Sequence, residues 1–357
     1  MRLSISLIGI AALTSSLSLT AVSAGPNKFC EGDFEPNAAH CKKFDFPSSS
    51  SSGSQSCTGK VQHLANCTTF YDISKLPEES IDDHTAKMAQ LITNVFENGD
   101  TKMGYAYVEK LGDCRGYTSG YIGFTTGTND AYMVVTQYLK RHPKSKLKKY
   151  LPELRRLSKL PFGDAGRDNI SGLKGYSKAW QKAACKDAEF IQTQLDVGHA
   201  MYLKPALKYA ASVGIKSNLG KALFYDTIIQ HGWQYVEPDI NLPRIIELTG
   251  PMGANETEKE YLTRFLTTRR QLVCCYPGDV WNESSDRMSD LQKLVDAWED
   301  NKDLRKAVHL ETFGVTIKGD EDMSWDSQNC KKAPKNKNKA KSVTLPIPDT
   351  CPNPLLS

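Results

Sequence analysis

The chain has 357 residues, of which 24% are charged and 39% are hydrophobic, and it is long enough to bury a sizeable core. Its net charge of +4 is unevenly placed, because residues 331–357 hold six lysines against one acid, Asp349, and without these residues and Arg2 the chain lies at about −2. A mildly acidic body favours a cationic partner over nucleic acid, and no stretch after residue 24 is apolar enough to cross a membrane.

Residues 1–24 have the features of a secretory signal peptide. Arg2 supplies the short positive start, an apolar stretch follows over residues 7–22, and small residues at 22–24 form a cleavage pattern. Hydroxyl side chains between residues 14 and 20 interrupt the apolar stretch, which is therefore too short for a membrane span. The sequence predicts an exported, extracellular protein that has no membrane segment once the signal is removed.

The cysteine count agrees with export. All ten cysteines follow the predicted signal, and an even count in an exported chain favours disulfides. They are Cys30, Cys41, Cys57, Cys67, Cys114, Cys185, Cys274, Cys275, Cys330 and Cys351. No C-x-x-C or H-E-x-x-H motif is present, so we expect no metal site. Candidate N-glycosylation sites lie at Asn66, Asn169, Asn255 and Asn282.

Three parts follow the signal. Residues 25–75 form a Cys/Ser-rich N-terminal extension, in which the serine run at 48–52 is typical of a flexible linker or loop. Residues 76–325 form one globular domain. Residues 326–357 form a basic C-terminal tail without aromatic residues to stack on bases, and we expect it to be solvated and disordered rather than a nucleic-acid arm.

Helical patterns dominate the globular domain. Met88, Leu91, Ile92, Val95 and Phe96 recur at helical spacing, and this helix should end at the Asn98-Gly99 pair. Further helices are expected at about 129–141, 146–159, 177–198, 219–230, 256–273, 288–298 and 302–309. Only residues 103–124, rich in Gly, Tyr and Thr, indicate a small sheet with turns. The fold class is therefore mainly α with one short β-element, without the βαβ alternation of a Rossmann or TIM fold.

Two carboxylates lie next to this β-element. Glu97 is at the end of the first helix of the domain, and Asp113 follows sixteen residues later. Hydrolysis of a glycosidic bond needs one carboxylic acid to protonate the leaving oxygen and one carboxylate to activate water or attack the sugar. Spacing alone is weak support, because a nearby Glu and Asp are more often a solvated pair.

Several short motifs surround the two carboxylates and continue along the chain. They are F-E-N at 96–98, G-D-C-R-G-Y-T-S-G at 112–120, G-T-N-D at 127–130, F-Y-D at 224–226, H-G at 231–232, F-L-T-T-R at 265–269 and S-D-R at 285–287. In this order they resemble the chitosanases of glycoside hydrolase family 46. The resemblance covers roughly residues 80–315 and leaves the N-terminal extension and the basic tail outside.

The resemblance implies a role for each matching residue. Glu97 would be the general acid, Asp113 the general base, and Thr118 would help to hold the attacking water in an inverting reaction. The implied fold is a two-lobed, lysozyme-like α+β structure whose small sheet lines the cleft between the lobes. A buried network of Asp226, Arg269 and Arg287 would support Glu97.

Five further residues are candidates for substrate binding. They are Arg115, Asp130, Tyr107, Tyr202 and His231. Asp130 would pair with a substrate amine, or it would cap the helix that begins there. The tyrosines could offer hydroxyls or ring faces to sugars, although a tyrosine such as Tyr202 is more often a core or surface residue. His231 has an alternative as a structural, hydrogen-bonding histidine.

The sequence thus predicts a secreted, monomeric endo-chitosanase that needs no cofactor and acts on chitosan, a cationic glucosamine polymer. One alternative is a lysozyme-like hydrolase of chitin or peptidoglycan. Another is a non-catalytic protein that binds cell-wall polysaccharide, with the basic tail as its anchor to an anionic polymer.

Overall fold

The computed structural model describes residues 30, 31, 34, 39–44, 46, 73–160, 164–233, 240–276, 281–336 and 340–348, with side chains omitted at 282 and 283. The predicted signal peptide, Asn66 and Cys57, Cys67 and Cys351 lie outside these residues. None of the helices in the described ranges combines the length and the apolar character that a membrane span requires.

The fold is mainly α-helical. The α-helices are α1 (Asp83–Asn98), α2 (Asp130–Arg141), α3 (Leu151–Ser158), α4 (Tyr176–Lys186), α5 (Ala188–Gly198), α6 (Lys204–Ser212), α7 (Asn218–His231), α8 (Leu242–Thr249), α9 (Glu258–Cys275), α10 (Asp286–Asp296) and α11 (Trp298–Asn301). A π-helical turn, His199–Leu203, joins α5 to α6. Short 3-10 helices lie at Ala39–Lys43, Ile73–Lys75, Lys146–Tyr150, Ala165–Asp168, Ser171–Leu173 and Asn282–Ser285.

Two small antiparallel sheets complete the fold. Strands β1 (Val108–Lys110), β2 (Tyr117–Ser119) and β3 (Phe124–Thr125) form the first sheet, in which Glu109 pairs with Thr118 and Thr118 with Thr125. Strands β4 (Val308–Leu310) and β5 (Val315–Ile317) form the second. The sheet predicted within residues 103–124 is confirmed, and the second sheet is an addition to it.

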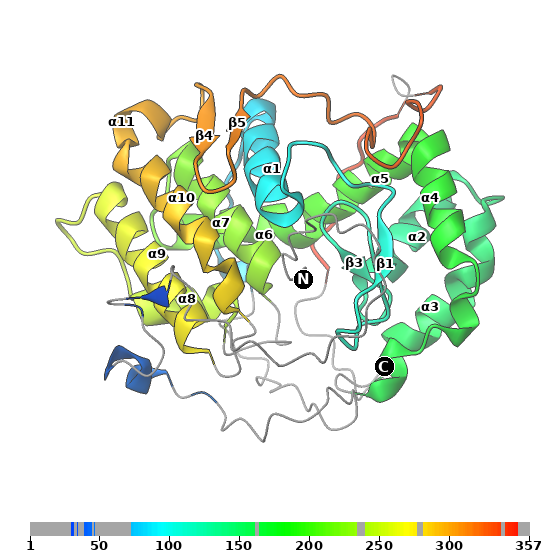
Figure 1. Cartoon of the computed structure of the whole chain (residues 1–357), viewed down its shortest axis with the longest axis horizontal. Helices are drawn as coiled ribbons and strands as arrows, with labels where there is room; N and C mark the ends of the chain where they lie inside the picture. The colour runs from blue at the N-terminus through cyan, green and yellow to red at the C-terminus, as the bar shows by residue number, and fades with distance from the viewer. Residues whose placement is uncertain are drawn as a thin grey trace, which may run out of the picture.

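Two separate hydrophobic cores define two lobes. The first core gathers side chains from α1, α6 to α10 and the β4–β5 hairpin. The second gathers them from residues 103–124 and from α2 to α5. Figure 1 shows α8 to α11 at one end of the molecule, α2 to α4 at the other, and α1 and the three-stranded sheet between them. Tyr202 packs against both cores, which places it where the lobes meet.

Most predicted helices are present, with differences at their ends. The predicted 146–159 helix begins as a 3-10 turn before α3, and the predicted 177–198 helix divides at Asp187, which caps α5 by accepting the Glu189 N–H. The predicted 288–298 helix is α10 followed by the short α11. The helix predicted at 302–309 is wrong, because Leu304 adopts a left-handed conformation and residues 308–310 form β4.

The predicted disulfides are confirmed for the cysteines that the structure describes. Cys30 pairs with Cys274 and Cys41 with Cys275, so two bonds tie the N-terminal extension to α9. Cys185 of α4 pairs with Cys330. Cys114 is also disulfide-bonded.

The basic tail is exposed over much of its described part but is not a free arm, so the expectation of a disordered tail is wrong there. The buried Asp196 carboxylate accepts hydrogen bonds from the Ser342 hydroxyl at 2.8 Å and the Val343 N–H at 3.1 Å. Lys204 Nζ donates to the Leu345 carbonyl at 2.8 Å. Hydrogen bonds to buried or helical groups therefore hold a segment that is too polar to form a core.

Candidate active site

Glu97 lies in the last turn of α1, where the ends of the helix fix its direction. The Asp82 side chain caps the first turn by accepting the Thr85 N–H, and Gly99, with φ of 79°, ends the helix by donating its N–H to the Val95 carbonyl. Because glycine adopts this left-handed conformation at little cost, the chain turns away directly after Asn98. Glu97 consequently sits at the end of a rigid, buried helix.

A continuous chain of ion pairs runs from Glu97 into the interior. Arg287 Nη2 donates to Glu97 Oε1 at 2.8 Å, and Arg287 Nη1 donates to Asp226 Oδ1 at 3.2 Å. Asp226 Oδ2 in turn accepts from Arg269 Nη1 at 2.8 Å. Glu97 is 8% exposed, whereas the other three side chains are 2% exposed or less. The structure thus brings the predicted support residues together behind Glu97.

Electrostatics keep both arginines of this chain charged. Burial lowers the pKa of Arg269 to about 10, while the charge of Asp226 opposes the change. Burial alone would lower the pKa of Arg287, but the charges of Asp226 and Glu97 outweigh it and raise this pKa. Two carboxylates and two arginines therefore compensate one another out of water, and the loss of any one would leave a buried charge unpaired.

Asp113 lies in the tight turn between β1 and β2. Gly112 and Gly116 adopt φ of 74° and 76°, and Cys114 adopts φ of 65°, which is unusual for a residue with a side chain. The Arg115 N–H donates to Asp113 Oδ1 at 3.1 Å. The other oxygen, Asp113 Oδ2, is buried and has no hydrogen-bond partner among the described residues. The turn therefore fixes the carboxylate through one oxygen and leaves the second one available.

Thr118 lies on β2 of the same hairpin. The residue is fully buried, and its Oγ1 has no hydrogen-bond partner within the described part of the chain. A buried polar atom is usually paired with protein or with ordered water. Asp113 Oδ2 and Thr118 Oγ1 are thus two buried polar atoms of one hairpin that have no partner among the described residues.

Contacts from outside the hairpin hold its turn in place, and sequence reasoning missed them. Asp168 accepts the Gly116 N–H at 3.0 Å and pairs with Lys110 at 3.0 Å. The Thr126 hydroxyl accepts the Tyr117 N–H at 2.9 Å and lies where a side chain at Gly116 would have to go. No motif marks Asp168, because its partners lie more than fifty residues away.

Asp130 is buried at the first residue of α2. Its Oδ1 accepts the N–H groups of Thr125 and Ala131, each at 3.0 Å, and the hydroxyl of Thr128. Burial raises the pKa of Asp130, although these hydrogen bonds act in the opposite direction. The predicted capping role is therefore not what the structure shows, because Asn129 is the N-cap and Asp130, the first residue of α2, bonds the turn before the helix instead. A contact between Asp130 and a substrate amine stays a prediction.

Tyr202, Tyr107 and Arg115 are all partly exposed. Burial, followed by the charge of Asp130, raises the pKa of Tyr202 well above 10, which places its hydroxyl near that carboxyl group. The Tyr107 hydroxyl donates to Glu109 Oε2 at 2.6 Å on β1. Sugar contacts by these three side chains stay predictions.

The structure does not support a substrate contact for His231. The residue is 1% exposed at the end of α7, and its ring packs against Trp281 with 5.0 Å between centroids. Burial, and then the charges of Arg269 and Arg287, hold its pKa well below 6.5. Neither ring nitrogen has a hydrogen-bond partner among the described residues. His231 is therefore a neutral interior side chain beside the arginine network.

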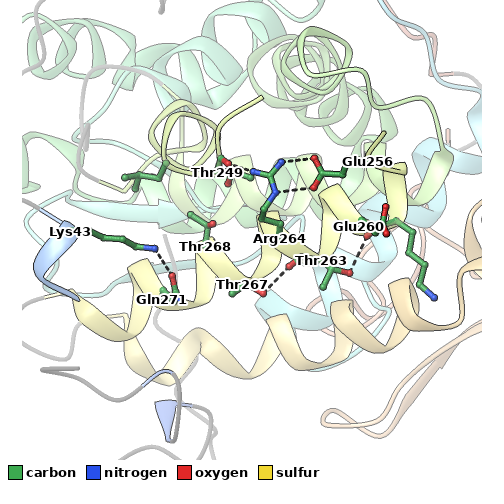
Figure 2. A pocket seen from close by; sticks show the side chains of 11 residues that line it. Lys43, Thr249, Glu256, Glu260, Thr263, Arg264, Thr267, Thr268 and Gln271 are labelled. Atoms are coloured by element: carbon green, nitrogen blue, oxygen red, sulfur yellow. Dashed lines mark hydrogen bonds and ion pairs between the residues drawn. The ribbon is translucent and has the colours of Figure 1, made fainter. Parts of the chain in front are cut away.

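A groove of about 560 Å³ lies elsewhere, over the side of α9 next to α8. Figure 2 shows Thr263 and Thr267 one helical turn apart, Arg264 paired with Glu256, and Lys43 bonded to Gln271. No predicted site residue lines this groove. His40 lies close to Cys41 and Cys275, but both sulfurs form a disulfide, so this group is not a metal centre.

Comparison with known proteins gives consistent matches. Residues 91–306 match the model of glycosyl hydrolase family 46. A chitosanase of Bacillus subtilis (strain 168) is 40% identical over 232 residues, which cover 63% of this chain and 80% of the relative. A chitosanase of Streptomyces sp. (strain N174) is 32% identical over 240 residues, covering 65% and 81% respectively.

Solved structures match the same region. The native chitosanase of Bacillus subtilis MY002 superposes with a TM-score of 0.58 at 37% identity, covering 67% of this chain and 100% of that one. A family 46 chitosanase of Gynuella sunshinyii, solved in complex with chitotetraose, superposes with a TM-score of 0.58 at 31% identity, covering 67% and 98%. The mostly helical fold with a small antiparallel sheet is therefore shared with these proteins.

Proposed function

The chain belongs to glycosyl hydrolase family 46, and from this membership we propose that it is a secreted endo-chitosanase that hydrolyses β-1,4 bonds between glucosamine units with inversion. The observation that carries the proposal is the placement of two carboxylates in different settings. Glu97 ends a buried chain of ion pairs, whereas Asp113 lies in a hairpin turn with one oxygen that has no partner among the described residues.

The two settings suit two different roles. Glu97, held by Arg287 at the end of α1, would take up a proton before the reaction, deliver it to the oxygen that leaves, and return to the ionised form that pairs with Arg287. Asp113 would accept a proton from a water molecule held between its Oδ2 and the Thr118 hydroxyl. The water attacks the anomeric carbon on the face opposite the leaving group, so the β-bond yields an α-product in one displacement.

Chitosan is favoured over chitin or peptidoglycan as the substrate. The relatives above carry the name chitosanase, and a Bacillus subtilis MY002 variant was solved with six glucosamine units. That variant matches this chain at 35% identity with a TM-score of 0.57. A body that is acidic outside its basic segments also suits a polymer of ammonium-bearing sugars.

The test is release of reducing ends from fully deacetylated chitosan, chitin and peptidoglycan by the native protein and by Glu97→Gln. We expect release from chitosan by the native protein, and a kcat lower by about 10²–10⁴-fold in the variant because the proton donor is lost while the shape is kept. Faster release from chitin or peptidoglycan than from chitosan would show that chitosan is not the preferred substrate. A Glu97→Gln variant with native kcat would show that Glu97 is not the general acid.

A further inference from the structure

Positive charge is concentrated in one segment of the second lobe. Residues 140–186 hold 14 of the 45 Lys and Arg residues but only three of the 41 Asp and Glu residues. The remaining 31 basic and 38 acidic residues leave the rest of the chain at −7. The modest net charge of the protein therefore hides a strongly cationic segment on a body of opposite sign.

Helix α4 turns part of this charge into a row on one side of the helix. Lys178, Lys182 and Lys186 recur every four residues on α4, and Lys174 lies just before the helix, ahead of its N-cap Gly175; all four side chains are exposed. Four residues advance a helix by about 6 Å, so the part of the row on α4, Lys178 to Lys186, is roughly 12 Å long. Residues four apart lie on the same side of a helix, which makes the row continuous.

The opposite side of α4 faces the catalytic hairpin. Its buried residues are Tyr176, Trp180 and Ala184. The Tyr176 ring stacks on Tyr117 of β2, and Trp180 Nε1 donates to the Tyr105 carbonyl at 2.9 Å. Because the buried residues alternate with the lysines by two positions, the row of lysines points away from the hairpin.

Contacts at both ends of α4 extend the row. At its start, the Tyr150 hydroxyl donates to the Lys174 carbonyl, and the Lys149 ammonium lies 4.6 Å from the centre of the Tyr150 ring. At its end, the Cys185–Cys330 disulfide holds the exposed Lys331 and Lys332 beside α4. Figure 1 shows the C-terminal segment passing there. We define the cationic face as Lys149, Lys174, Lys178, Lys182, Lys186, Lys331 and Lys332.

The cationic face is not neutralised from within the protein. Among the described residues, no carboxylate forms a salt bridge with any of its lysines, in contrast to Arg156 on neighbouring α3, which pairs with Glu153. Like charges four residues apart on a helix destabilise it. A solvated helix side would gain stability from acids between the lysines, so this row is arranged for a partner that supplies negative charge along a line.

We propose that the cationic face binds a linear acidic polysaccharide whose charges are carboxylates. The proposal rests on the proposed function, because chitosan is a polycation that associates with polyanions, and an enzyme acting on it would meet both polymers together. Since the cationic face points away from the hairpin, the acidic polymer can be held without blocking the catalytic residues. The face would repel chitosan itself, which keeps the two polymers on separate surfaces.

The side-chain chemistry favours this partner over nucleic acid or a membrane. All seven residues of the cationic face are lysines, so the face lacks the planar guanidinium of arginine, which suits bidentate recognition of phosphate. The aromatic rings of α4 are buried and cannot stack on bases. The exposed large hydrophobic residues of the described ranges are Leu111 and Val343, and neither belongs to this face to insert into lipid.

The test compares native protein with a variant carrying Lys178→Gln, Lys182→Gln and Lys186→Gln. A control variant with three exposed lysines of the other lobe changed to Gln removes the same net charge; these are Lys216, Lys306 and Lys318. Binding of each protein to polyglucuronate, duplex DNA and phosphatidylserine vesicles is measured at low and at physiological salt. Turnover of glucosamine oligomers and the melting temperature are measured on the same preparations.

We expect the face variant to bind polyglucuronate at least about tenfold more weakly, with a flatter salt dependence, while the control variant stays within about twofold of native. The melting temperature of the face variant should be unchanged or higher because like charges are removed, and its turnover of glucosamine oligomers should match that of the native protein. Equal binding by all three proteins would overturn the proposal. So would tighter binding of DNA or vesicles than of polyglucuronate at physiological salt. If the native protein does not hydrolyse glucosamine oligomers, the proposed function is overturned instead. Binding to polyglucuronate is a separate measurement, so the two outcomes can be told apart.

Discussion

At the scale of single residues, Arg287 is the group on which the site depends most. Its guanidinium contacts Glu97 on one side and Asp226 on the other, and it also lies over the Phe96 ring, 5.4 Å from the centroid. Removing it would leave Glu97 without its ion-pair partner and Asp226 with Arg269 alone. The same contacts aim Glu97, so stability and catalysis should be affected together.

We predict that Arg287→Ala lowers the free energy of unfolding by about 3–5 kcal/mol, the typical cost of breaking a buried ion pair. The matched control is Arg155→Ala on α3, where an exposed guanidinium donates to the Tyr132 hydroxyl, and it should cost less than about 1 kcal/mol. Urea unfolding and kcat on glucosamine oligomers are measured for both. Similar unfolding curves and similar rates for the two variants would contradict the network.

His231 gives the site a pH-dependent stability. Its folded pKa is held well below 6.5, whereas in the unfolded chain it is about 6.5. Below pH 6.5 the unfolded chain therefore binds a proton that the folded protein does not. The stability linked to this group is fully present above that pH and is lost as the pH falls toward the folded pKa.

We predict that the stability difference between native protein and His231→Gln shrinks by about 1.4 kcal/mol between pH 7.5 and pH 5.5, because only the native protein carries this proton-linked loss. Urea unfolding of both proteins at the two pH values provides the measurement. A difference that is the same at both pH values would show that His231 titrates normally in the fold.

At the scale of elements, a segment beyond the family match supports the loop between the two carboxylates. The fully buried Asp326 accepts the Ala106 N–H at 2.8 Å, and the Tyr105 hydroxyl donates to the Met323 carbonyl at 2.8 Å. Gln328 Nε2 donates to Asp100 at 2.5 Å. Because residues 100–106 connect the end of α1 to β1, these contacts set how Glu97 and Asp113 lie relative to each other.

We predict that Asp326→Ala costs about 1–3 kcal/mol of stability, since it leaves buried N–H groups unpaired. It should also lower kcat by up to about a hundredfold with little change in KM, because a displaced loop moves the acid relative to the base. Asp320→Ala, at a nearby exposed carboxylate, is the control and should behave as native. Native kcat in a correctly folded Asp326→Ala protein would contradict a positioning role.

How far the sequence could predict each element depends on where the deciding contacts lie. The α1 helix follows from local spacing and from the Asn98-Gly99 stop. The break at Asp187 does not, because the carboxylate that caps α5 is also bonded to Tyr138 and Asn336, which are distant in sequence. The β4–β5 hairpin was missed although Val308, Leu310 and Ile317 alternate with exposed residues, since the predicted helix covered the first strand.

The same contrast applies to the site. Glu97, Asp113 and Thr118 stand in recognisable motifs, and residues 226, 269 and 287 could be matched by order along the chain. That these three residues are buried, and in which order they pair, could be learned only from the structure. His231 stands in the H-G motif of the resemblance, which left a substrate contact and a structural role both open, and its burial and packing against Trp281 show that it is interior.

At the scale of the whole molecule, two lobes with separate cores meet at the segment that carries both carboxylates. The first lobe supplies Glu97 and its ion-pair chain, and the second supplies the hairpin with Asp113 and Thr118. The tail crosses this division, since Leu345 packs against the second core and Ile347 against the first. Composition alone could not show that the tail is held in place, because the carboxylate that binds it, Asp196, lies about 146 residues away in the sequence.

The measurement that tests the central claim most directly is the anomeric form of the first product. Proton NMR is recorded immediately after native protein is mixed with fully deacetylated chitosan, and again with Asp113→Asn. We predict that the native protein forms the α-anomer first and that Asp113→Asn forms product at least about 10²-fold more slowly, because Asp113 activates the water that inverts the centre. A β-anomer as the first product would contradict the account, because it would require a covalent intermediate and a different role for Asp113.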